Sequence, residues 1–151
     1  MRRKDREMST LFAKQVFTDC EYAMLATVDS MNKPYCIPIS PIIAGDIIYF
    51  HCAKEGQKLE NINMNANVCI SGVSFSKPVA EKFTMEYKSA VAFGICSEVF
   101  EDEEKLQALK LITEKYAKDN MKAFEKQAEI DLSRTCVMKI QIETITGKAN
   151  I

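Results

Sequence analysis

The order of apolar and polar residues along the chain predicts a protein built mostly of short strands. Alternating or short apolar segments predict strands at residues 22–28, 35–43, 47–50, 68–75, 89–99 and 136–143. Apolar residues that recur every three to four positions predict helices at residues 6–18, 56–66, 102–116 and 121–128. The final strand has the clearest pattern, because alternate positions hold Cys136, Met138, Ile140 and Ile142. Residues 76–83 have no readable pattern.

Prolines, one glycine and one aspartate refine these elements. Pro38 and Pro41 donate no backbone hydrogen bond, so we expect the strand at residues 35–43 to lie at an edge or to be broken by a bulge. Gly94 lies inside a predicted strand and indicates a bulge or a close approach of two backbones. Asp102 is predicted to cap the helix that follows it, in which acidic residues lead and lysines trail, as the helix dipole favours.

The predicted order is a helix, three strands, a short helix, two or three strands, helices and a last strand. Most strands are joined by short turns, which favours antiparallel pairing. A sheet of six or more short strands usually closes on itself to remove its edges. We therefore expect a mainly β (α+β) fold, a small antiparallel barrel with peripheral helices, with residues 1–151 forming a single domain.

Composition narrows the class of protein. Apolar residues make up 47% of the chain, which fits a folded domain with a real core, and the net charge of −1 argues against a general nucleic-acid binder. No apolar run approaches the roughly 20 residues of a membrane helix. The charged start lacks the apolar stretch of a secretory signal, so we expect a cytoplasmic protein with no membrane partner. The cysteines form no CxxC pair and only one histidine accompanies them, so we expect no metal site and reduced, mostly buried thiols.

The candidate chemistry gathers in one stretch, "YFHCAKEGQKLENI". It holds the only histidine, His51, at the end of a predicted strand, and Gly56 and Lys58 at the start of a predicted helix. A helix start exposes unpaired N–H groups, glycine lets the backbone approach a ligand, and Lys58 adds a positive charge, so the corner suits a phosphate monoester. Gln57 adds an amide donor, and Lys54 is the alternative cation.

His51 and Cys52 end the predicted strand, and we expect their backbone and side chains to face the same space as the helix start. A structural interpretation competes with the functional one. Glycine before a helix is common, a lysine in a first turn is usually solvated, and a sole histidine is more often hydrogen-bonded than catalytic. Both interpretations stay open on these residues alone.

Five stretches, in order and over nearly the whole chain, resemble the flavin-binding split-barrel superfamily that includes the pyridoxamine 5'-phosphate oxidases. They are "MRRKDREM", "MLATVDSMNKPYCIPIS", "IYFHCAKEGQKLENINMNANVCIS", "YKSAVAFGICSEVFEDEEK" and "VMKIQIETITGK". The corner "YFHCAKEGQK" is the most specific, and the opening "MRRKDRE" is typical of the nitroimidazole-resistance (Nim) branch. The resemblance implies a dimeric split β-barrel, a homodimer in which FMN lies in a groove between the two barrels.

The resemblance also implies which residues bind FMN, with Gly56 beside them at the helix start. Lys58 resembles the phosphate-binding lysine of the family, whereas Gln57 takes the place of an arginine in the oxidases. The strand-end pair that touches the flavin is matched by His51 and Cys52, and the strand along the flavin ring by Pro38, Ile39 and Ser40. Ser89 stands where the oxidases have a glutamine that contacts the flavin.

For function, the resemblance implies an FMN-dependent oxidoreductase whose small-molecule substrate is a nitroaromatic of the 5-nitroimidazole kind. His51 would donate a proton or hydrogen-bond the nitro oxygens. The alternative is a non-catalytic module of the same fold that holds haem or flavin, with His51 as the candidate axial ligand. Oxidation of vitamin B6 is not expected, because the chain lacks the C-terminal arginine- and tryptophan-bearing segment with which the oxidases hold pyridoxal phosphate.

Overall fold

The structure is a computed structural model that describes residues 2–151, without the side chains of residues 129, 131 and 133. Met1, which opens the first motif, lies outside the described residues. The helices are α1 (Thr10–Asp19), α2 (Gln57–Met64), α3 (Asp102–Tyr116) and α4 (Phe124–Arg134), with the 3₁₀ turns η1 (Lys4–Arg6), η2 (Ala80–Lys82) and η3 (Lys118–Ala123). The strands are β1 (Glu7–Met8), β2 (Ala23–Val28), β3 (Pro34–Ile39), β4 (Ile42–Ala44), β5 (Ile47–Cys52), β6 (Asn67–Val79), β7 (Thr84–Glu98) and β8 (Cys136–Asn150). In the part of the chain that is described, no helix is both long and apolar enough to cross a membrane.

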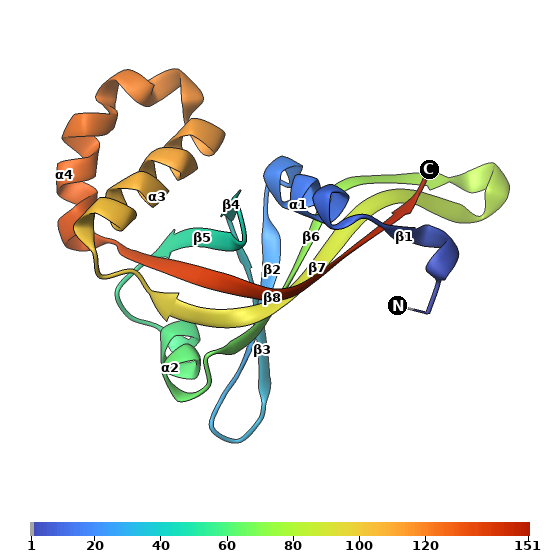
Figure 1. Cartoon of the computed structure of the whole chain (residues 1–151), viewed down its shortest axis with the longest axis horizontal. Coiled ribbons are helices and arrows are strands. Elements are labelled where there is room, and N and C mark those ends of the chain that lie inside the picture. Colours follow the sequence, from blue (N-terminus) through green and yellow to red (C-terminus); the bar gives the residue numbers. More distant parts are fainter. Residues whose placement is uncertain (1) are drawn as a thin grey trace.

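An eight-stranded antiparallel sheet forms the body of the described chain (Figure 1). The two strands at its ends follow each other in the sequence. The strand order is β3-β2-β6-β7-β8-β5-β4, and β1 pairs with β8. Strands β3 and β4 stand at opposite ends of this order, yet only Ser40 and Pro41 separate them along the chain. The sheet therefore curls until its ends lie close together, which confirms the predicted split β-barrel with helices around it.

Strands β6, β7 and β8 are long and extend beyond the barrel as an arm, on the side away from α3 and α4 (Figure 1). Within the barrel, the pairing of β7 with β8 shifts register between Phe93 and Gly94. A Cβ atom on Gly94 would collide with the carbonyl oxygen of Gln141 and lie 2.9 Å from its carbon. Only glycine permits this approach, so the predicted bulge at Gly94 is confirmed.

Among the described residues, two buried clusters form the core. The larger fills the barrel and the space under α1, and its fully buried side chains include Phe17, Leu25, Phe50, Ile70 and Ile140. The smaller lies between α3 and the outer face of the sheet, where it includes Ile42, Tyr49, Val99, Leu109 and Val137.

A polar contact at the edge of the smaller cluster fixes the start of α3. The Tyr49 hydroxyl donates to Glu104 Oε1 at 2.8 Å, and Lys139 Nζ donates to Glu104 Oε2 at 2.8 Å. Lys139 holds the pKa of the Glu104 carboxyl below its ordinary value, while burial and the Glu104 carboxylate raise the pKa of Tyr49 to about 12. The contact ties α3 to β5 and β8.

The start of α1 differs from the prediction. The helix begins at Thr10 rather than at Arg6. Residues Glu7–Met8 pair with β8, and the Ser9 hydroxyl accepts the N–H of Phe12 at 3.2 Å as an N-cap. The strand pairing and the cap together delay the helix, because the apolar stripe alone does not mark where a helix begins.

Several other boundaries differ. The strand predicted at residues 35–43 is divided into β3 and β4, and the strand predicted at residues 136–143 continues to Asn150. Asp102 is the first residue of α3 and not its cap, since Glu101 takes the N-cap position without a side-chain cap hydrogen bond. The acidic first turn and Lys115 in the last turn still follow the helix dipole, as predicted. The helix predicted at residues 121–128 is the 3₁₀ turn η3 followed by α4, which continues to Arg134. The unreadable residues 76–83 hold the end of β6 and the turn η2.

Candidate functional site

The corner predicted from the sequence is a strand-to-helix turn that requires glycine. Gly56 is the N-cap of α2 and has a φ of 127°, a conformation that residues with side chains rarely adopt. Its carbonyl accepts the N–H groups of Leu59 at 2.9 Å and of Glu60 at 3.2 Å. Glycine has no side chain with which to cap the first N–H groups of the helix, so these groups remain for water or a ligand.

Next to this corner lies a cavity of about 380 Å³, which we call the β3–β5 hollow. It is lined by Tyr22, Ile37, Pro38, Ile39, Ser40, His51, Cys52 and Lys58. The strand predicted to lie along a ring, the predicted strand-end pair and the predicted lysine thus meet in one place, although they come from β3, β5 and α2.

The hollow opens where the barrel is split. Strand β5 pairs with β4 only as far as Tyr49, whereas its pairing with β8 continues to Cys52. Strand β3 pairs with β2 on one side and stands at the end of the sheet on the other, the edge position predicted from its prolines. On the sides of β3 and β5 that face the split, the backbone groups at the strand ends therefore pair with no other strand of the described chain.

Lys58 supplies the positive charge of the hollow. It is half-buried, and among the described residues it takes part in no ion pair. The lining residues of the described chain include no carboxylate that would neutralise it. Lysine and the start of α2 together make this end of the hollow favourable for an anion.

His51 and Cys52 line the hollow, but their side chains do not face the same space. Successive side chains of a strand point to opposite faces, so His51 is exposed while Cys52 packs against the core cluster inside the barrel. This corrects the expectation drawn from their shared position at the strand end. Burial raises the pKa of the Cys52 thiol, an effect that nearby Lys58 opposes, and burial also raises the pKa of Cys136 to about 12. These thiols therefore stay protonated near neutral pH.

Three predicted residues are not among those that line the hollow. Gly56 lies at the corner next to it, as the N-cap of α2. Gln57 is exposed and lines a separate cavity with Asp29, Ser30 and Asn61. Ser89 lies in the arm, where its hydroxyl donates to the backbone oxygen of Lys148 at 3.4 Å. Within one chain, the structure does not bring Ser89 to the hollow.

Two residues that the sequence interpretation missed also line the hollow, namely Tyr22 and Ile37. Tyr22 directly precedes β2, and the first residue of β2, Ala23, pairs with Ile39. The register of the β2–β3 hairpin would have placed Tyr22 beside Ser40, but that register is not evident from local periodicity.

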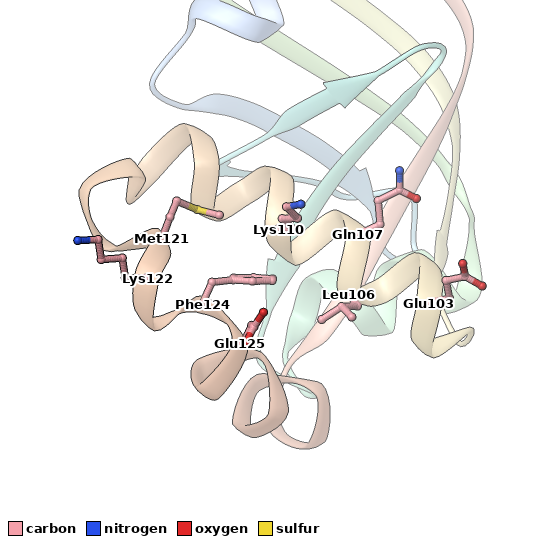
Figure 2. Close-up of a pocket in the computed structure, with 8 residues that line it drawn as sticks. All are labelled: Glu103, Leu106, Gln107, Lys110, Met121, Lys122, Phe124 and Glu125. Carbon is pink, nitrogen blue, oxygen red and sulfur yellow. The ribbon is translucent and has the colours of Figure 1, made fainter.

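A larger cavity, of about 830 Å³, lies between α3 and the segment η3–α4 (Figure 2). Leu106, Met121 and Phe124 form its apolar surface, and its rim holds Lys110, Lys122, Glu103 and Glu125. None of the sequence-predicted residues lines it, and its two lysines are matched by two glutamates. The smaller β3–β5 hollow is therefore the candidate site, because it combines an anion-favouring end with unpaired strand backbone.

Comparison with known proteins agrees with this assignment of fold. A family model described as pyridoxamine 5'-phosphate oxidase matches residues 15–149. No protein of curated function matches the chain. The family match confirms the superfamily that the sequence motifs resemble.

Several solved structures are similar over most of the chain. One, from Bacteroides thetaiotaomicron, has a name that assigns it provisionally to 5-nitroimidazole antibiotic resistance; it is 26% identical, with a TM-score of 0.81 over 94% of this chain and 85% of its own. It agrees with the resemblance to the nitroimidazole-resistance branch. The FAD and haem binding protein of Mycobacterium smegmatis is 18% identical, with a TM-score of 0.75 over 96% of this chain and 73% of its own. The haem storage protein HutZ of Vibrio cholerae is 17% identical, with a TM-score of 0.68 over 89% and 91%. At these identities the last two show the fold alone.

Proposed function

Because the chain belongs to the pyridoxamine 5'-phosphate oxidase family, we propose that it binds FMN in the β3–β5 hollow and reduces small nitroaromatic compounds of the 5-nitroimidazole kind. One observation carries the proposal: the hollow has an apolar strand edge on one side and Lys58, at the start of α2, on the other. The Bacteroides protein named for 5-nitroimidazole resistance supports the substrate class.

The residues of the hollow fit a flavin nucleotide. Small-molecule sites have volumes of roughly 300–1,000 Å³, and the hollow holds about 380 Å³. Ile37, Pro38 and Ile39 offer apolar surface and strand backbone to a flat aromatic ring, and the backbone groups continue to Ser40. The N–H groups that follow Gly56, together with the ammonium group of Lys58, suit a phosphate monoester.

When bound, the flavin supplies electron transfer, singly or as hydride. The chain would bind and orient it: Lys58 would hold the phosphate, and the backbone of Pro38, Ile39 and Ser40 would hold the ring. Cys52 would contribute its backbone, because its side chain packs against the core cluster. Gln57 lines the neighbouring cavity, but it is the first residue of α2 and would be a second ligand for the phosphate.

His51 is the candidate catalytic residue. It lines the hollow, and its side chain is exposed rather than packed into the core. An imidazole nitrogen there has access to a substrate that enters from solvent. In this proposal His51 donates a proton, or a hydrogen bond, to a nitro oxygen.

We also propose that the working unit is a homodimer of the single domain formed by residues 1–151. Val73, Phe93 and Ile95 share the outer face of β6 and β7, where Val73 and Phe93 are 51% and 53% exposed. An apolar strand face of this kind favours burial by a second copy. Ser89 pairs with Val73 on the same face, so dimerisation is the route by which Ser89 would reach a flavin, in the hollow of the partner.

Turnover tests the function. The purified protein is loaded with FMN, the flavin is reduced without oxygen, and its reoxidation is followed after a 5-nitroimidazole is added. The proposal predicts reoxidation at a rate above that of free FMN, with loss of the nitro group's absorbance. Reoxidation no faster than that of free FMN would leave a flavin-binding protein without this activity.

Haem is the second candidate cofactor, because the only histidine of the chain lines the hollow. A haem protein would purify with a Soret band that His51→Gln abolishes. FMN bound equally by the wild type and His51→Gln would count against this candidate.

A further inference from the structure

Two polar side chains are buried together between α2 and the sheet. Asn61 of α2 is 3% exposed and Thr27 of β2 is 2% exposed. Asn61 Nδ2 donates to Thr27 Oγ1 at 3.0 Å, and the Thr27 hydroxyl in turn donates to the backbone oxygen of Tyr35 at 3.4 Å. Buried polar groups are costly unless they are paired, so both side chains are held to this one arrangement.

This pair of hydrogen bonds connects α2 to β3, two of the elements that line the β3–β5 hollow. Asn61 follows Lys58 by one helical turn, on the same face of α2. Tyr35 lies in β3, opposite Thr27 in the register of the hairpin and two residues before Ile37, the first residue of β3 that lines the hollow. The two hydrogen bonds thus link α2, which carries Lys58, to β3, which forms the apolar edge of the hollow.

Apolar packing alone would define the position of α2 less sharply. Ile62 is buried and Leu59 packs against the core, but contacts of this kind tolerate a small rotation or slide of a two-turn helix. A hydrogen bond between an amide and a hydroxyl is directional and weakens steeply when it is bent or stretched. A small rotation of α2 would break the bond to Thr27 before it exposed Ile62.

We propose that Asn61 is a positioning residue for the phosphate end of the hollow: through Thr27 and Tyr35 it fixes the rotation of α2, and with it the place of Lys58 relative to β3. The inference rests on the proposed function, since the phosphate is that of FMN. It assigns the buried pair a part in cofactor recognition rather than in folding alone.

The test compares FMN with riboflavin, which has the same ring and lacks the phosphate. Thr27→Val keeps the shape of the side chain and removes the hydroxyl. We expect the affinity for FMN to fall by roughly tenfold and that for riboflavin by less than about twofold, because a misplaced lysine affects only the phosphate contact. Thr27→Ser keeps the hydroxyl and should retain the wild-type ratio of the two affinities. Asn63→Leu, at an exposed position of the same helix, is the matched control and should also retain it.

A double variant separates positioning from stability. In Thr27→Val with Asn61→Leu, both polar partners become apolar, so most of the stability lost in Thr27→Val should return. If the pair positions Lys58, the ratio of FMN to riboflavin affinity stays low in the double variant. A ratio that recovers with stability, or that never changes in Thr27→Val, would overturn the inference. A wild-type protein that binds riboflavin as tightly as FMN would instead overturn the phosphate contact of Lys58, and the inference with it.

Discussion

Replacing Lys58 by alanine tests the phosphate end of the hollow with a magnitude that the structure sets. Lys58 makes no ion pair with the described residues, so its loss should change the free energy of unfolding by less than about 0.5 kcal/mol. A hydrogen bond from a charged donor contributes about 1.5–3 kcal/mol. The affinity for FMN should therefore fall by about 10- to 150-fold at 25 °C. The remaining affinity comes from the ring and from the N–H groups of α2.

The assay is a titration followed by quenching of flavin fluorescence, done with FMN and with riboflavin at two salt concentrations. Riboflavin should bind the wild type and Lys58→Ala equally, and raising the salt should weaken FMN binding more in the wild type. Lys54→Ala, at an exposed position four residues earlier, is the matched control and should leave the affinity for FMN unchanged. Lys58 is not the phosphate ligand if Lys58→Ala binds FMN like the wild type, or if Lys54→Ala reproduces the loss.

Three further predictions concern chemistry, fold and pH. In His51→Gln, FMN should stay bound while reduction of a 5-nitroimidazole slows by about 10²-fold; an unchanged rate in stopped-flow measurements would leave His51 as a lining residue only. Gly94→Ala should lower the free energy of unfolding, measured in urea, by about 3 kcal/mol, because its Cβ meets the Gln141 carbonyl. Gly45 has a φ of 62° and open space around it, so Gly45→Ala should lower the free energy of unfolding by only about 1 kcal/mol. Equal losses in the two variants would contradict the close approach at Gly94. The fold raises the pKa of the Tyr49 hydroxyl to about 12. The stability that the protonated hydroxyl contributes is therefore complete below a pH of about 10 and is lost as the pH rises through about 12. Urea unfolding across that range should show the loss in the wild type but less of it in Tyr49→Phe, and equal losses would contradict the shift.

The local pattern of apolar and polar residues was enough to predict most helices and strands of the barrel. The alternation at residues 136–143 marks a strand, and β8 has that pattern because Cys136, Met138 and Ile140 face the core of the barrel. Gly94 was informative because only glycine tolerates the backbone contact that the bulge creates. Proline in β3 indicated an edge strand for a similar reason, since it cannot donate to a neighbour.

Element boundaries were harder to predict, because they depend on contacts far along the chain. The start of α1 is set by the pairing of Glu7–Met8 with β8, which lies near the other end of the sequence. The long arm of β6 and β7 includes residues with no apolar alternation, because strand pairing rather than a core holds them in place.

The site was predicted in part for the same reasons. Lys58 and the ends of β3 and β5 converge because the barrel is split, and the family resemblance supplied that topology where periodicity could not. The opposite directions of His51 and Cys52 follow from strand geometry, and the strand prediction already contained that information. The buried pair of Asn61 and Thr27 left no sequence signal, because a polar residue on a short helix usually faces solvent.

The cofactor that the protein carries after purification shows directly whether the β3–β5 hollow binds FMN. Protein purified without added cofactor would be denatured, and the released chromophore identified by mass spectrometry and quantified against the protein. We expect FMN, at up to one molecule per chain, and much less of it in Lys58→Ala prepared in the same way. Haem in place of FMN, or a protein that carries no flavin and takes up none when FMN is added, would show that the hollow does not bind FMN.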